Sequence, residues 1–157
     1  MRTTIACTLA IVSVVGASLI ADTTVPANLA TRLRGASRTV VGSVARLEPR
    51  MVRTPRGDEL IVTRTWFRVE EALKGRADTY LAVDVEGGTL GDISMRASDI
   101  TPFVVGERAV VMVEPTADGG WRPHRRGLGL LRLSPDNRVR DLGVSLADVR
   151  RLAAEVR

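Results

Sequence analysis

Three side chains of one expected strand have the types and spacing of a ligand-binding face. Arg64, Trp66 and Arg68 alternate along residues 60–70, so an extended strand presents them on one side. An indole ring between two guanidinium groups can stack on a sugar or a base and bind its anionic groups. In the structural alternative, Trp66 packs beneath a helix while the arginines reach water along their aliphatic stems. A single ring makes a poor stacking platform, which favours the packing alternative.

The single histidine lies in a basic segment. His124 is surrounded by Arg122, Arg125 and Arg126, and no carboxylate lies close to it in sequence. Nearby positive charge favours the neutral imidazole. A metal site needs further ligands, and the chain has only one Cys and one His. A surface loop is therefore favoured over a metal site or a catalytic base.

The acidic pairs are not arranged for catalysis. Glu70 and Glu71 are neighbours on a strand and point to opposite faces, so they cannot converge as glycosidic chemistry requires. Asp84 and Glu86 share a face, but we expect that face to be solvated. The Gly106-Glu107 pair is typical of a turn. No phosphate loop, nucleophile elbow or His-Glu-x-x-His helix is present. We therefore expect a non-enzymatic protein with no catalytic residues, no metal and no cofactor.

The first 21 residues are typical of an export signal. Arg2 gives a short positive region, residues 3–21 carry no charge, and small residues precede cleavage sites after Ala17 or Ala21. The alternative is an uncleaved membrane anchor, the chain's only expected membrane contact. Thr, Ser and Gly dilute this run, which favours a cleaved signal and export to the periplasm or the extracellular space. Cys7 lies inside the segment, so its removal leaves no cysteine for disulfides.

Length and net charge limit the number of domains and the class of partner. The 157 residues suffice for one domain. Lys plus Arg number 23 against 18 Asp plus Glu, giving a net charge of +5. The basic residues, nearly all arginine, are dispersed and lie near acids. A nucleic-acid partner is therefore not favoured, because such a partner requires a clustered basic stripe.

The expected elements combine two helices with several short strands. The first helix spans residues 27–37, with Leu29, Leu33 and Ala36 on its buried face and Arg32 and Arg34 pointing away. A final helix starts at a capping box formed by Ser145 and Asp148. Residues 71–75 favour a short helical turn or a bend closed by Gly75. Period-two alternation or apolar runs predict strands at 40–47, 60–70, 80–86, 93–96, 109–114, 128–133 and 139–142.

These elements predict a mainly β fold. Short strands with turns every ten or so residues indicate a small OB-like antiparallel β-barrel with a short N-terminal helix and a C-terminal helix, preceded by the signal peptide. Gly42 inside the first strand predicts a bulge or tight bend. The expected organisation is a signal peptide at 1–21, linker and helix at 22–38, barrel at 39–143 and helix at 144–157.

Four segments carry a resemblance to known proteins. They are Val40–Val44, Val69–Gly75, Gly87–Gly88 and Phe103–Val111, in that order. Their spacing resembles a group of exported bacterial proteins of unknown function and, more distantly, netrin-like and metalloproteinase-inhibitor domains. The resemblance implies an OB-type barrel. The inhibitors act through an amino-terminal cysteine and are held by disulfides, neither of which is available here, so the inhibitory mechanism is not supported.

Three functional hypotheses follow. The first is an exported interaction module whose partner is another exported protein or an envelope component. The second is binding of a polyanion or oligosaccharide through Arg64, Trp66 and Arg68. The third, implied only by the distant resemblance, is a protease-inhibitor-like protein.

Overall fold

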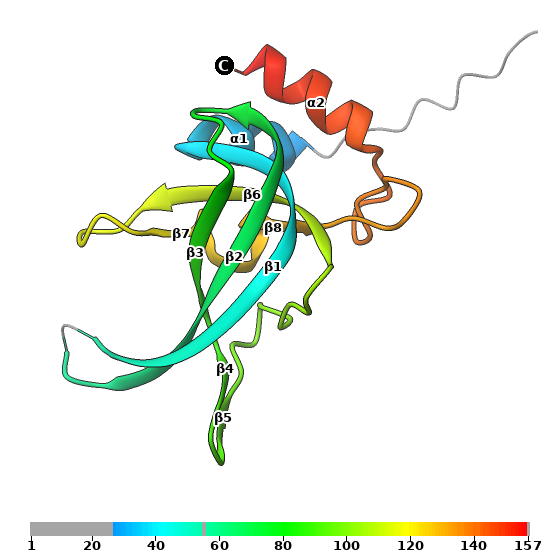
Figure 1. The fold of residues 1–157 in the computed structure, drawn as a ribbon. Coiled ribbons are helices and arrows are strands. Elements are labelled where there is room, and N and C mark those ends of the chain that lie inside the picture. Colours follow the sequence, from blue (N-terminus) through cyan, green and yellow to red (C-terminus); the bar gives the residue numbers. More distant parts are fainter. Residues whose placement is uncertain (1–26, 55, 157) are drawn as a thin grey trace, which may run out of the picture.

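The computed structural model describes residues 27–54 and 56–156, and the predicted signal peptide lies outside them. Figure 1 shows two helices at one end of a curled sheet, with a small hairpin projecting at the other end. In chain order the elements are α1 (Ala27–Gly35), β1 (Arg38–Arg53), β2 (Glu59–Lys74), β3 (Tyr80–Glu86), β4 (Gly88–Leu90), β5 (Ile93–Met95), β6 (Arg108–Pro115), β7 (Trp121–Pro123), the 3-10 helix η1 (Arg126–Gly129), β8 (Leu130–Arg132) and α2 (Leu146–Glu155).

The main sheet is antiparallel throughout. Its strands follow the order β3-β2-β1-β6-β7, and β8 also pairs with β6. The long β1 and β2 form a hairpin, while β4 and β5 pair only with each other. A mainly β, antiparallel fold with two helices is therefore confirmed.

The described strands do not close into a barrel. The two ends of the path, β3 and β7, lie against each other but no ladder joins them. β7 is only three residues long, and its last residue, Pro123, has no backbone N–H to donate. The sheet is thus curled but open, in contrast to the closed barrel that the strand spacing predicted.

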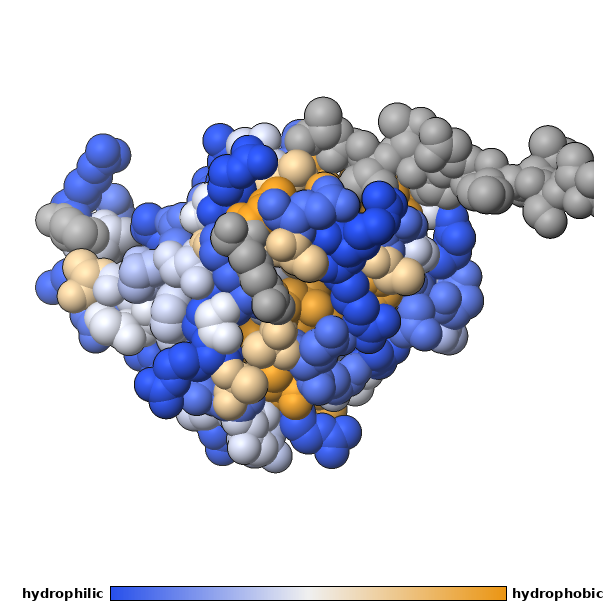
Figure 2. Space-filling model, turned by 90° about the horizontal axis from the view of Figure 1, so that it is seen from above, coloured by the Kyte–Doolittle hydropathy of each residue, from blue (hydrophilic) through white to orange (hydrophobic). Residues whose placement is uncertain are grey.

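The central strand β6 is buried on both faces, as its apolar run predicted. Val110 and Met112 pack against the two helices, whereas Val111 and Val113 face the inside of the curl. The helix side also buries Leu29, Leu33, Val41, Leu73, Leu131, Leu146, Val149 and Ala153, and the inside of the curl buries Val40, Val44, Phe67, Leu81, Val83, Val85 and Phe103. From the helix end, hydrophobic surface lies among hydrophilic side chains (Figure 2).

The predicted irregularity at Gly42 is confirmed. The register between β1 and β2 shifts between Val41 and Gly42. A Cβ atom built on Gly42 would lie 2.7 Å from the carbonyl oxygen of Arg68. Glycine at this position therefore permits the close approach of the two backbones.

Two strands extend beyond their predicted ends. Residues 71–74 form no helical turn; β2 continues to Lys74, which pairs with Thr39, and the bend predicted as the alternative occurs at Gly75. The pairing with β1 and the burial of Leu73 under the helices outweigh the local preference for a turn. β1 likewise runs to Arg53 rather than ending at residue 47.

The two last predicted strands are shorter than expected. Residues 128 and 129 belong to η1, and β8 begins at Leu130. Residues 139–142 contribute only an isolated bridge between Val139 and Leu133.

Arg32 of α1 does not point to solvent as predicted. Only 4% of the residue is exposed, and its guanidinium donates to the carbonyl of Leu128 and to Oδ1 of Asn28, both at 2.9 Å. Arg34 is exposed, as expected. Tertiary contact with η1 supplies one acceptor, the carbonyl of Leu128, that the helix pattern alone does not reveal.

The predicted capping box of α2 is confirmed. The amide of Asp148 donates to Oγ of Ser145 at 3.1 Å, and the amide of Ser145 donates to the Asp148 carboxylate at 3.2 Å. These bonds satisfy amides at the helix start that lack intrahelical partners. Within the described ranges, neither helix has the length and apolarity needed to cross a membrane.

Candidate functional site

Arg64 lies on the predicted face but is held by an acidic neighbour. Its Nε and Nη2 atoms donate to the two carboxylate oxygens of Asp84 at 2.9 and 3.1 Å. Asp84 also binds Arg50 at 2.6 Å, and its side chain is only 17% exposed. The hydrogen bonds from Arg64 to Asp84 raise the pKa of Arg64. Its guanidinium is thus engaged in a structural ion-pair cluster.

Trp66 is half-buried and oriented by two residues of β1. Its Nε1 donates to Glu48 at 2.8 Å, and the guanidinium of Arg46 lies 4.8 Å from the centroid of its ring. These groups belong to the neighbouring strand rather than to a helix. The hydrogen bond and the cation–π contact together hold the indole in a defined orientation.

Arg68 carries the exposed positive charge of this face. The residue is exposed, and no residue in the described part of the chain forms an ion pair or hydrogen bond with its guanidinium. Of the two predicted arginines, therefore, Arg68 is free to bind an anionic group and Arg64 is not.

Tyr80 adds a second aromatic ring that the sequence did not connect to the site. Tyr80 of β3 is paired in register with Arg68 of β2, and half of it is exposed. Alternation along residues 80–86 does place Tyr80 outward. Only the antiparallel register brings it to the same face as Trp66, because Trp66 is paired with Ala82, two residues along β3.

An open hollow of about 340 Å³ lies between the two aromatic residues. It is lined by Trp66, Tyr80, Arg46 and the small side chain of Ala45. The register of β1 shifts next to Ala45, between Val44 and Arg46. Bulges of this kind re-aim side chains beside functional sites. We define these four residues together with Arg68 as the aromatic face.

A second hollow adjoins the aromatic face. It has a volume of about 430 Å³ and shares Ala45, Tyr80 and Arg68 with that face. Glu70 and Arg108 also line it and bind each other at 2.7 Å. The hydrogen bonds from Arg108 lower the pKa of Glu70. Glu70 and Arg108 form an ion pair with each other, whereas Arg68 acts on Glu70 only through its charge and forms no ion pair among the described residues.

His124 is packed rather than placed in an open loop. Its Nδ1 atom lies 2.6 Å from Oε2 of Glu114, and its side chain is only 14% exposed. The β6–β7 pairing, which places Glu114 opposite Arg122, brings this carboxylate close to His124. The hydrogen bond from His124 lowers the pKa of Glu114. No group of three or more metal-ligating side chains occurs in the described ranges.

The other acidic residues also serve ion pairs. Glu70 binds Arg108 of β6 whereas Glu71 binds Arg150 of α2, so the two point to different faces as predicted. Asp84 was expected to be solvated but is largely buried between Arg50 and Arg64. Much of the arginine content thus neutralises carboxylates within the fold.

Comparison with protein-family models finds none that matches this chain, and comparison with curated proteins finds no significant match. The resemblance to exported bacterial proteins and netrin-like domains therefore stays a prediction.

Proposed function

We propose that this protein is an exported, non-enzymatic binding module whose aromatic face binds an acidic oligosaccharide. The observation that carries the proposal is the open hollow between Trp66 and Tyr80 beside the unpaired Arg68. The charge pattern of residues 1–21 supports export. The curled antiparallel sheet supports an open variant of the OB-like architecture.

The chemistry of the hollow suits a sugar ring with an acidic substituent. Trp66 and Tyr80 both line the opening and supply apolar ring surface there, while Arg46 covers one face of the Trp66 ring and Glu48 accepts from its Nε1. Arg68 presents a planar guanidinium that can bind a carboxylate through two parallel hydrogen bonds. Because Glu48 and Arg46 already orient Trp66, binding costs little side-chain entropy there.

A protein partner is the second candidate. Val104 and Val105 are 64% and 63% exposed, and Val105 lines the hollow that shares Tyr80 and Arg68. Tyr80 and Arg68 are of residue types enriched at protein interfaces, and Val105 adds exposed apolar surface beside them. This observation favours another exported protein as the alternative ligand.

Isothermal titration calorimetry of the full chain with a galacturonate oligomer tests the proposal. A neutral glucose oligomer of equal length is the matched ligand. We expect the acidic sugar to bind more tightly, and its affinity to fall as salt is added. Tyr80→Ala and Arg68→Gln should each weaken binding about tenfold, which corresponds to ~1.4 kcal/mol.

Arg34→Gln serves as the control variant, since Arg34 is an exposed arginine of α1, outside the aromatic face. It should bind the acidic sugar like the unmodified protein. Equal affinity for the acidic and neutral oligomers, or unchanged affinity in Tyr80→Ala and Arg68→Gln, would overturn the proposal. The second candidate would be supported instead if the unmodified protein binds no sugar but binds an exported protein. Tyr80→Ala and Val105→Ser should then each weaken binding of that protein.

A further inference from the structure

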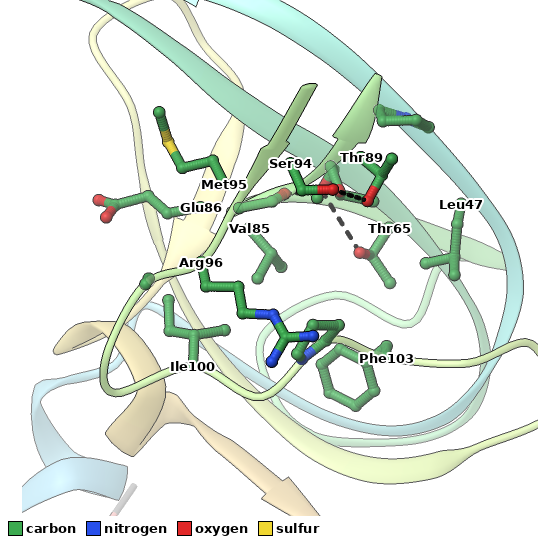
Figure 3. A pocket seen from close by; sticks show the side chains of 16 residues that line it. Leu47, Thr65, Val85, Glu86, Thr89, Ser94, Met95, Arg96, Ile100 and Phe103 are labelled. Atoms are coloured by element: carbon green, nitrogen blue, oxygen red, sulfur yellow. Dashed lines mark hydrogen bonds between the residues drawn. The ribbon is translucent and has the colours of Figure 1, made fainter. Parts of the chain in front are cut away.

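A separate pocket lies on the inner side of the curled sheet. It has a volume of about 260 Å³ and opens between the sheet, the β4–β5 hairpin and residues 96–103. Its apolar lining includes Leu47, Val85, Met95, Ile100, Pro102 and Phe103 (Figure 3). None of these residues belongs to the aromatic face, so the pocket is a distinct site.

Most polar groups around this pocket are satisfied within the protein. The hydroxyl of Thr63 donates to the carbonyl of Gly87 at 2.7 Å, and the hydroxyls of Thr89 and Ser94 bind each other at 2.9 Å. The carboxylate of Glu86 at the rim binds Arg126 at 2.7 Å. These groups therefore leave no uncompensated negative charge at the pocket.

Arg96 is the exception. Its side chain lines the pocket, and Figure 3 shows it reaching across the opening toward Phe103. No residue within the described ranges accepts a hydrogen bond or forms an ion pair with its guanidinium. The pocket thus combines an apolar interior with one unpaired cation.

Gly88 helps to form the wall of this pocket. Its φ of +141° lies in the region that favours glycine, and a Cβ atom there would lie 2.3 Å from Oγ1 of Thr63. The missing side chain lets the start of β4 lie directly against β2. The hairpin is therefore held over the pocket by the contact of Gly88 with Thr63 and by the hydrogen bond from the amide of Gly87 to the carbonyl of Ile61, rather than by a ladder with the main sheet.

We propose that this pocket binds a medium-chain aliphatic carboxylate, with its chain among the apolar residues and its carboxylate on Arg96. Ligand sites of this kind are mostly apolar, with a few polar groups that fix orientation. A cavity of about 150 Å³ holds benzene, so this volume suits a ligand of roughly ten non-hydrogen atoms. Octanoate has this size. Its single carboxylate supplies the counter-charge that no described residue gives to Arg96.

Calorimetric titration of the full chain with octanoate tests the inference, and octan-1-ol provides an uncharged ligand of similar size. We expect octanoate to bind at least about tenfold more tightly than the alcohol. Arg96→Gln should remove that preference by weakening octanoate binding about 10- to 100-fold. Arg96→Lys should restore part of it, because the charge remains while the planar fork is lost.

Arg34→Gln again provides the control and should bind octanoate like the unmodified protein. Equal binding of octanoate and octanol, or octanoate affinity unchanged by Arg96→Gln, would overturn the inference. The galacturonate titration keeps the two proposals apart. Arg96→Gln should leave galacturonate binding unchanged, and Tyr80→Ala should leave octanoate binding unchanged.

Discussion

The carboxylate of Glu107 binds the guanidinium of Arg132 at 2.6 Å, and both side chains are largely buried, with 8% and 13% exposed. The same guanidinium lies 4.1 Å from the centroid of the Phe103 ring and also donates to the carbonyl of Thr101. Arg140 approaches the other oxygen of Glu107 at 3.7 Å. Glu107 therefore ties the segment before β6 to β8 and stacks a cation on the aromatic residue that closes the inner core.

Removing the charge of Glu107 should destabilise the protein. In Glu107→Gln, Arg132 stays buried without its counter-charge, and we expect the free energy of unfolding to fall by about 3 kcal/mol. Urea denaturation measures this difference. The matched control is Glu59→Gln, which breaks an exposed pair with Arg53 and should cost under about 1 kcal/mol. Equal losses of unfolding free energy in the two variants would show that the Glu107–Arg132 pair contributes little to stability.

The buried arginine of α1 should anchor η1. Arg32→Met retains the aliphatic stem but removes the hydrogen bond to the carbonyl of Leu128. We expect a loss of about 1–2 kcal/mol in unfolding free energy and faster amide hydrogen exchange in η1. Arg34→Met changes an exposed residue of the same helix and should alter stability by under about 0.5 kcal/mol. Unchanged exchange in Arg32→Met would contradict the anchoring function.

The bulge at Gly42 should not accept a side chain. In Gly42→Ala the new methyl group meets the carbonyl oxygen of Arg68, and β1 must move away from β2. We expect a loss of about 1–3 kcal/mol, measured by thermal or urea unfolding. Ala45→Ser on the same strand is the control, because Ala45 is exposed and its change should cost under about 0.5 kcal/mol. A Gly42→Ala protein as stable as the original would refute the steric argument.

Stability should fall in acid, partly through Glu114. Its ordinary pKa is 4.5, and the folded protein lowers that pKa through hydrogen bonds from His124 and then Arg122. Because the pKa is lower in the folded state, the ionised carboxylate stabilises the protein above about pH 4.5. This contribution is lost as the pH falls through the folded value.

Glu114→Gln removes the titrating group and tests this linkage. The unfolding free energy of the variant should fall less steeply than that of the original protein between about pH 5 and pH 3. Chemical denaturation at several pH values measures both slopes. Parallel slopes would show that Glu114 contributes nothing to acid sensitivity.

The sequence predicted which β2 side chains share the outer face of the candidate site. It predicted only in part which of them can bind a ligand. Alternation along residues 60–70 places Arg64, Trp66 and Arg68 on one side, and the structure agrees. The sequence could not show that Arg64 is held by Asp84 or that Tyr80 stands beside Arg68. Both relationships depend on the β2–β3 register, which sequence alternation leaves open.

Sequence by itself determined the features that neighbouring residues dictate. These are the mainly β alternation, the doubly buried run of β6, the capping box at Ser145 and the need for glycine at Gly42. Each follows from side-chain direction or backbone geometry within a few residues.

Tertiary structure alone decided which charges remain free. Arg32 and Arg64 are held by hydrogen bonds, whereas Arg68 and Arg96 form no hydrogen bond or ion pair among the described residues, and the charge of Arg68 acts on Glu70 only from a distance. It also decided that the sheet stays open and that a pocket forms under the β4–β5 hairpin. The physical reason is that ion pairs, cavities and sheet closure depend on residues far apart in the chain, whose approach is set by register and by packing on two faces of one sheet.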